Sequence, residues 1–189
     1  MREVPAAPGP EPQMFRSYLR LLAELQLGAH AGTGIDPSDI VQQTLLDAHR
    51  DQHKFRGQTE SERLAWLRRL LACNLADALR MKHRTKRDVT RERSLESVIE
   101  VSSARLRALL AADQSSPSEK AGRNEEVIQL VDALAKLPQA NRLALVMRHC
   151  EGLPLSEIST RLKRTPAAVA GLLKRGLAEL RTMLPPDRD

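Results

Sequence analysis

The feature that most restricts the fold of this chain is the helical spacing of its leucines, combined with a near absence of aromatic residues. Hydrophobic residues make up 41% of the 189 positions, but aromatic residues make up only 2%. Segments rich in leucine and poor in β-branched residues favour helices over strands. Any core must then be filled mainly by aliphatic side chains. The sequence therefore predicts an all-α protein.

The apolar spacing predicts two small helical domains joined by a flexible linker. In the first domain a long helix carries leucines near one side, at positions 64, 67, 71, 75 and 79. Between the domains the sequence becomes polar and rich in serine, as linkers are, although residues 104–113 could form a short helix. The predicted divisions are a disordered Pro-rich segment 1–12, a first domain 13–94, a linker 95–124, a second domain 125–184 and a tail 185–189.

The second domain ends in a helix-turn-helix pattern, in which a turn at 163–165 separates two predicted helices. Thr165 suits the N-cap of the second helix, and Pro166 suits its first position. At 3.6 residues per turn, Val169, Leu173 and Gly176 share one face of that helix, which we expect to point inward.

The opposite face of the same helix combines small residues with cations. Small side chains let a helix backbone lie deep in the major groove of DNA, and Lys and Arg can hold phosphates or guanine edges. Gly171 favours this interpretation over a solvent-facing helix, because an exposed glycine within a helix costs about 1 kcal/mol relative to Ala. The candidate duplex-binding residues are Lys163, Arg164, Thr165, Ala167, Ala168, Gly171, Lys174 and Arg175.

Positive charge is concentrated in two segments of the chain. The formal net charge is +6, and residues 139–184 carry eight basic and three acidic side chains. Residues 80–93 carry seven basic and two acidic side chains. Such an excess favours a polyanionic partner, nucleic acid before a membrane surface. No apolar run approaches the length of a membrane span, so we expect no membrane partner.

The sequence gives no sign of a metal or cofactor site. Cys73 and Cys150 lie far apart in apolar helical patterns, as small buried side chains in a reducing cytoplasm would. His49 and His53 could share a helix face and a metal ion, but no third ligand lies close in sequence. There is also no nucleophile–base constellation and no phosphate-cradling glycine loop. We therefore expect no cofactor, no metal and no enzymatic activity.

Two blocks of the chain carry a family resemblance. The first block consists of the segments DPSDIVQQTLLDAHR, KFRG and LAWLRRLLACNLADALR. The first segment contains an acidic residue, an apolar pair and Gln; the second is an aromatic-Arg-Gly loop; and the third contains Trp-Leu and, further on, an Asn. These segments resemble region two of bacterial extracytoplasmic-function (ECF) sigma factors, of the sigma-70 family. LAKLPQANRLALVMRHCEGLPLSEISTRL and the helix after it resemble region four of the same family, and DQSSPS and AVAGLLKRGLAELR resemble a planctomycete-type subgroup. The residues that fit region two are Asp39, Ile40, Val41, Gln42, Phe55, Arg56, Gly57, Trp66, Leu67 and Asn74.

The resemblance implies a subunit that binds core RNA polymerase, directs it to promoters and promotes DNA melting. The implied partners are the clamp helices of the largest polymerase subunit, the polymerase flap, promoter DNA and, as for many relatives, an anti-sigma factor. The free chain is then expected to be a cytoplasmic monomer. A helix-on-helix contact needs apolar anchors with polar residues for register. The implied polymerase-binding residues are Asp39, Ile40, Val41, Gln42 and Leu45.

The loop 54–58 and the helix after it are implied to hold the melted minus-ten element. Proteins hold single-stranded DNA by stacking on its bases, pocketing a flipped base and pairing phosphates with cations. For Trp66, burial in the core is an alternative to base contact. The duplex-binding residues of the second domain would read the minus-thirty-five element. The implied minus-ten residues are Lys54, Phe55, Arg56, Gly57, Gln58, Trp66, Arg69, Asn74, Arg80, Arg84, Lys86 and Arg87.

The second domain departs from the family pattern at several positions. Many relatives place Ser or Thr where Pro154 stands, Gly where Lys163 stands, and Lys or Arg where Ala170 and Leu172 stand. Two other functions also fit the composition. One is a helix-turn-helix regulator that binds duplex DNA without polymerase and would not need the SDIVQQ and KFRG blocks. The other is a helical scaffold whose basic face binds acidic proteins.

Overall fold

The computed structural model describes residues 12–28, 34–83, 89–111 and 123–184. Within these ranges the chain forms eight α-helices and no strand, which confirms the all-α prediction. The helices are α1 (Arg16–Gly28), α2 (Pro37–Arg50), α3 (Glu60–His83), α4 (Val89–Ala111), α5 (Arg123–Lys136), α6 (Gln139–Leu145), α7 (Leu155–Leu162) and α8 (Pro166–Met183). The structure also contains three short elements: the 3-10 helices η1 (Pro12–Phe15) and η2 (Gln52–Lys54), and the π-helix η3 (Val146–Cys150).

Helices α1, α2 and α3 pack against one another around a leucine-rich core. The five leucines of α3 at positions 64, 67, 71, 75 and 79 are all buried, as their spacing predicts. They meet Phe15 and Tyr18 at the start of the chain's described part, and Val41 from α2. The two aromatic side chains supply large buried volume in a core that is otherwise aliphatic.

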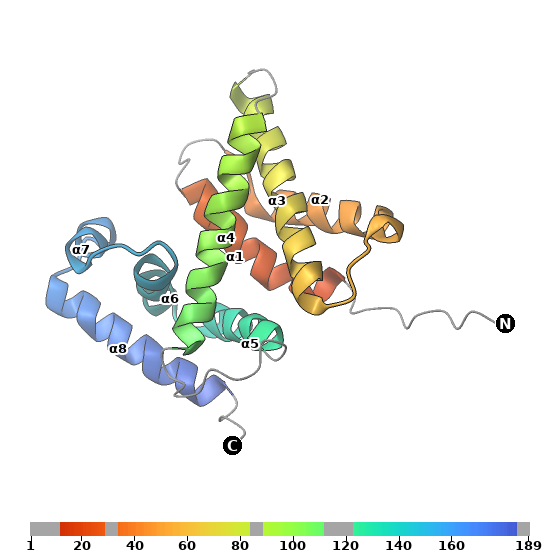
Figure 1. Ribbon diagram of the computed structural model, residues 1–189. Coiled ribbons are helices and arrows are strands. Elements are labelled where there is room, and N and C mark those ends of the chain that lie inside the picture. The colour runs from red at the N-terminus through yellow and green to blue at the C-terminus, as the bar shows by residue number, and fades with distance from the viewer. Residues whose placement is uncertain (1–11, 29–33, 84–88, 112–122, 185–189) are drawn as a thin grey trace.

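Helix α4 crosses the predicted boundary between the first domain and the linker. It is continuous over Val89–Ala111 and packs against α1, α3, α5 and η3, so residues 95–111 are helical rather than linker (Figure 1). Its inward apolar residues Leu95, Ile99 and Leu106 are buried, but polar residues between them dilute the helical pattern in the sequence. The short helix predicted at 104–113 is the end of this longer one, and residues 112–122 lie outside the described ranges.

A buried polar cluster attaches α4 to α1 and α3. The Tyr18 hydroxyl donates to Ser103 Oγ at 2.8 Å and accepts from Arg68 Nη1 at 3.3 Å. Arg68 Nε lies 2.7 Å from Glu100 Oε2, and the Arg68 side chain is only 9% exposed. Removing the partner of a buried charge is strongly destabilising. This cluster therefore fixes both the position and the rotation of α4.

The other side of α4 contacts the C-terminal helices. Arg105 Nη1 donates to the carbonyl oxygens of Cys150 at 3.2 Å and Glu151 at 2.8 Å, at the end of η3. Gly152 follows with φ 76°, and a Cβ there would lie 3.1 Å from the Arg105 guanidinium carbon. A cation at a helix C-terminus also complements the helix dipole. Because α5 packs against α1 as well, the two predicted domains share one continuous core.

Helix α8 has the inner face that its sequence predicts. Val169, Gly176 and Leu180 are buried, and α8 packs mainly against α6. Gly176 permits that approach, because a Cβ at this position would lie 2.8 Å from Leu145 Cδ1 and 3.4 Å from Asn141 Cβ. Gly171, on the other side, faces only the flexible Arg175 side chain, with Nη1 3.3 Å from a built Cβ.

The two glycines of α8 should respond oppositely to alanine. Gly176→Ala should lower the free energy of unfolding by about 1 kcal/mol, because overpacking costs about 1–3 kcal/mol and the helix-propensity gain recovers about 1. Gly171→Ala should raise it by up to about 1 kcal/mol. Urea unfolding followed by circular dichroism measures both. Equal effects of the same sign would contradict the assignment of inner and outer faces.

Candidate nucleic-acid interface

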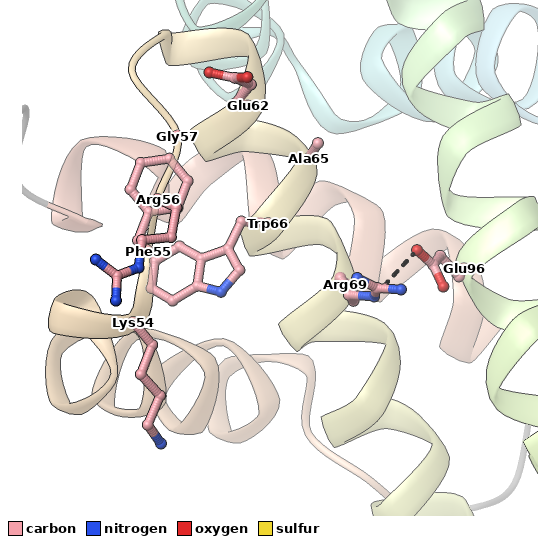
Figure 2. A pocket seen from close by; sticks show the side chains of 9 residues that line it. All are labelled: Lys54, Phe55, Arg56, Gly57, Glu62, Ala65, Trp66, Arg69 and Glu96. Atoms are coloured by element: carbon pink, nitrogen blue, oxygen red, sulfur yellow. Dashed lines mark ion pairs between the residues drawn. The ribbon is translucent and has the colours of Figure 1, made fainter.

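A surface pocket of about 520 Å³ lies where the loop after η2, the first turns of α3 and one residue of α4 meet (Figure 2). Its floor is aromatic, its loop side is basic, and its far wall is an ion pair. The lining residues are Lys54, Phe55, Arg56, Gly57, Glu62, Ala65, Trp66, Arg69 and Glu96.

An aromatic pair forms the floor of this pocket. The Phe55 and Trp66 rings lie with centroids 5.1 Å apart and planes tilted by 31°, and the Arg63 guanidinium carbon is 5.2 Å from the Phe55 centroid. Gly57 makes room for the Phe55 ring, since a Cβ at position 57 would lie 2.7 Å from Phe55 Cε2 and 2.8 Å from Glu62 Cβ. Trp66 is half-buried, so it contributes both to the packing beneath the pocket and to the pocket surface.

A capping box fixes the start of α3 beside the pocket. Glu62 accepts from the backbone N–H groups of Gln58 at 2.9 Å and Thr59 at 3.0 Å, while Thr59 Oγ1 accepts from Glu62 N at 3.2 Å. This is the reciprocal arrangement of the S/T-x-x-E motif. The hydrogen bonds from the Thr59 and Gln58 backbones, with that from the Thr59 hydroxyl, hold the pKa of Glu62 below its usual value.

The pocket brings together six of the residues predicted to bind the minus-ten element. Lys54, Phe55, Arg56, Gly57, Trp66 and Arg69 all line it, and Gln58 is exposed beside it in the same loop. Glu96 lines it too, and the sequence did not single it out. Its Oε1 lies 3.6 Å from Arg69 Nε. Helical continuity from position 89 onward is the signal that could have brought Glu96 into consideration.

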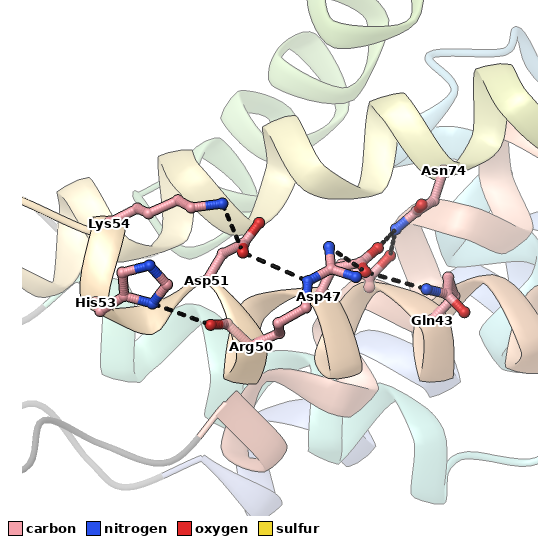
Figure 3. Close-up of polar contacts among 8 residues, drawn as sticks. Gln43, Asp47, Arg50, Asp51, His53, Lys54 and Asn74 are labelled. Atoms are coloured by element: carbon pink, nitrogen blue, oxygen red, sulfur yellow. Dashed lines mark hydrogen bonds and ion pairs between the residues drawn. The ribbon is translucent and has the colours of Figure 1, made fainter.

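Asn74, predicted to support the pocket, instead joins α3 to α2. Its amide donates to Thr44 Oγ1 at 3.2 Å and to Asp47 Oδ2 at 3.1 Å, away from the lining residues (Figure 3). Arg80 pairs with Asp77 on its own helix and is not part of the pocket. Three more predicted residues, Arg84, Lys86 and Arg87, lie outside the described ranges.

A chain of ion pairs continues from Asn74 to the pocket loop (Figure 3). Arg50 lies 2.9 Å from Asp47 and 3.4 Å from Asp51, and Lys54 Nζ lies 2.9 Å from Asp51. The hydrogen bonds from Lys54 and Arg50 hold the pKa of Asp51 below its usual value. The end of α2 is thereby tied to the loop that carries Phe55 and Arg56.

The outer face of α2 differs from the predicted polymerase-binding set. Ile40, Val41 and Leu45 are buried in the core, so in this structure they do not lie on the surface that a partner would contact. Asp39 and Gln42 are exposed, as a contact surface requires. The exposed apolar residue on this helix is Leu46, with 57% of its surface accessible. Thr44 and Ala48 are buried on the same face of α2.

The helix-turn-helix is formed as its sequence predicts. Helix α7 ends at Leu162, and Lys163 adopts a left-handed backbone conformation with φ 51° and ψ 47°. Helix α8 begins at Pro166, and the Thr165 hydroxyl accepts from Ala168 N at 3.2 Å as the N-cap. Glycine would take the Lys163 conformation without steric cost, which gives a physical reason for glycine in many relatives.

The predicted duplex-binding residues share one accessible surface. Lys163, Arg164, Thr165, Ala167, Lys174 and Arg175 are exposed, and Ala168 and Gly171 are partly exposed. Ala170 is exposed as well, whereas Leu172 is buried in the core and cannot contact DNA. The surface is therefore shallow in the middle and basic at its edges.

Residues 128–180 match the family model described as Sigma-70, region 4. The match begins within α5 and ends near the end of α8, so it includes α7, the turn and most of α8. The match supports a DNA-binding role in transcription initiation for this part of the chain. Among the described residues, no helix has both the length and the apolar character needed to cross a membrane.

Gly57→Ala should disturb the floor of the pocket. The added methyl group would displace the Phe55 ring from Trp66, so the fluorescence of Trp66, the single tryptophan, should change in intensity and emission maximum. Gly28→Ala is the matched control, because a Cβ there meets nothing within 4 Å. An emission spectrum identical to wild type for Gly57→Ala would contradict the described packing.

Proposed function

We propose, on the premise that residues 128–180 are a sigma-70 region 4, that this chain is a sigma factor of the extracytoplasmic-function type. In this function it binds core RNA polymerase, directs it to promoters and promotes DNA melting. The observation that carries the proposal is the presence of two separate DNA-compatible surfaces on one chain. One is the aromatic and basic pocket of α3, and the other is the small and basic face of α8.

The pocket suits unpaired bases rather than duplex DNA. Phe55 and Trp66 offer ring faces on which any base can stack, and base–aromatic stacking contributes about 1–3 kcal/mol per base. Lys54, Arg56 and Arg69 stand around the rings, where their cations can reach the phosphates or the base edges of an extruded strand. Such contacts offset the few kcal/mol that unstacking a base costs. The pocket would thus favour the melted minus-ten strand.

The accessible face of α8 suits the major groove of the minus-thirty-five element. Lys163 and Arg164 stand at the N-terminal end of α8, and Lys174 and Arg175 stand two to three turns further along. Between them the alanines and Gly171 let the backbone approach the base edges. Because alanine offers few hydrogen bonds, phosphate contacts and DNA shape carry much of the recognition.

The outer face of α2 is the proposed docking surface for the polymerase clamp helices. Leu46 supplies an exposed apolar anchor, and the exposed polar side chains of Asp39 and Gln42 can fix how the two helices align. Apolar anchors surrounded by polar residues are typical of helix-on-helix recognition. Polar contacts of Asp47 and Asp51 connect α2 to the pocket loop. The proposed docking surface and the proposed base-binding pocket are therefore parts of one connected unit.

The test of this function is a pull-down with core RNA polymerase, followed by run-off transcription from promoters selected with the assembled enzyme. We expect the chain to assemble with the core and to confer promoter-specific initiation. Binding to duplex DNA without polymerase would favour the stand-alone regulator, and binding to acidic proteins alone would favour the scaffold.

Leu46→Ala should weaken assembly with core polymerase by about tenfold, because truncating an apolar interface anchor typically costs 1–2 kcal/mol or more. Asp39→Arg should weaken it as well. The matched control is Val98→Ala, which shortens a similarly exposed apolar side chain on α4. Fluorescence anisotropy with labelled chain measures the affinities. Wild-type affinity for both α2 variants would remove α2 from the interface.

Lys174→Ala combined with Arg175→Ala should reduce promoter-specific transcription by tenfold or more while sparing core binding. Each lost phosphate contact should also reduce the slope of log affinity against log salt by about 1. Lys136→Ala, which removes an exposed cation from the end of α5, is the control. Transcription equal to wild type from the double variant would exclude this face of α8 as the promoter contact.

A further inference from the structure

Glu96 reaches the pocket from α4, a helix outside the segment that the family resemblance assigns to promoter melting. Figure 2 shows its carboxylate pointing toward the Arg69 side chain, on the side of Trp66 away from Phe55. The two side chains form a loose ion pair, with Glu96 Oε1 3.6 Å from Arg69 Nε. A carboxylate on the rim of a pocket for a polyanion is unfavourable unless it makes a specific contact there.

The Arg69–Glu96 pair contributes little to holding the fold. Its side chains are 71% and 46% exposed, and exposed ion pairs are worth little for stability. The next glutamate along α4 is different, because Glu100 neutralises the buried Arg68 at 2.7 Å. Two glutamates one turn apart therefore have separate tasks, and only Glu96 lines the pocket.

The other acidic residue of the pocket is held at the start of α3 through one of its two oxygens, Oε2. Glu62 accepts three hydrogen bonds from Gln58 and Thr59 at the start of α3. The aromatic floor cannot discriminate among bases, because every base has a ring face. Discrimination then falls to the polar side chains, and the wall opposite the loop offers a donor in Arg69 and an acceptor in Glu96.

An extruded base presents its Watson–Crick edge to such a wall. Cytosine and adenine each offer on that edge an exocyclic amino group beside a ring-nitrogen acceptor, which matches a carboxylate beside a guanidinium. Thymine and uracil instead place one imino N–H between two carbonyl oxygens, and a carboxylate repels those oxygens. Glutamate is an established partner of the cytosine amino group.

We propose that Glu96 is a specificity-determining residue of the pocket, selecting an extruded cytosine or adenine over thymine. This inference rests on the proposed function, since it requires that the pocket receives unpaired bases. Arg69 assists by donating to the acceptor beside the amino group. The selection is therefore made jointly by α3 and α4.

The test compares oligo-deoxycytidine with oligo-deoxyuridine of about twelve nucleotides, bound by the full chain assembled with core polymerase. These probes share ring size and backbone and differ in the edge that Glu96 would face. We expect wild type to prefer oligo-deoxycytidine by about tenfold. Glu96→Ala should abolish that preference, partly by tightening the binding of oligo-deoxyuridine, a gain that a merely structural role would not produce.

Glu24→Ala is the matched control, since it removes a partly exposed, ion-paired carboxylate on α1 that does not line the pocket and should leave the ratio unchanged. A preference that survives Glu96→Ala, or a wild type that binds both probes equally, overturns the inference. Phe55→Ala separates it from the proposed function. If Phe55→Ala abolishes binding while Glu96→Ala leaves the ratio intact, only the inference fails. If wild type binds neither probe, the proposed function fails with it.

Discussion

The buried guanidinium of Arg68 is the constraint on which the arrangement of this protein depends. A charge so enclosed must keep its partner, and Glu100 of α4 supplies it at 2.7 Å, beside the Tyr18–Ser103 hydrogen bond. Satisfying this pair sets how far α4 is rotated about its axis. The residue one turn earlier, Glu96, then faces the pocket, and Arg105 faces the carbonyls that end η3.

The two DNA-compatible surfaces are built by different physical means. The pocket of α3 depends on side chains held by polar contacts, with Gly57 admitting the Phe55 ring and a capping box fixing the loop. The face of α8 depends on the absence of side-chain bulk, with Gly176 drawing the helix onto α6 and alanines leaving the outside shallow. The first suits extruded bases and the second suits an intact groove.

Local and periodic signals made much of this fold predictable. The leucines of α3 repeat at helical spacing, so their burial followed from the sequence alone. Thr165 and Pro166 mark the start of α8 through capping geometry that involves only neighbouring residues. The sequence also singled out the pocket loop, and four of its residues, Lys54, Phe55, Arg56 and Gly57, line the cavity.

Contacts between distant segments were not predictable in the same way. The partners of Arg68 and Arg69 lie on α4, and no local pattern indicates that these glutamates approach α3. The amide of Asn74 binds Thr44 and Asp47 for a similar reason, since its direction depends on how α2 and α3 cross.

Helix α4 contacts α3 through Glu100 and the end of η3 through Arg105. Both contacts form only if the number of residues between them turns the two side chains to the right directions. Each residue inserted into an α-helix turns everything beyond it by about 100° and advances it by about 1.5 Å. One extra residue between Glu100 and Arg105 would swing the guanidinium away from the end of η3 while leaving the Arg68 pair in place. The length of α4 between these two contacts and the direction in which the residues beyond them point therefore cannot vary independently.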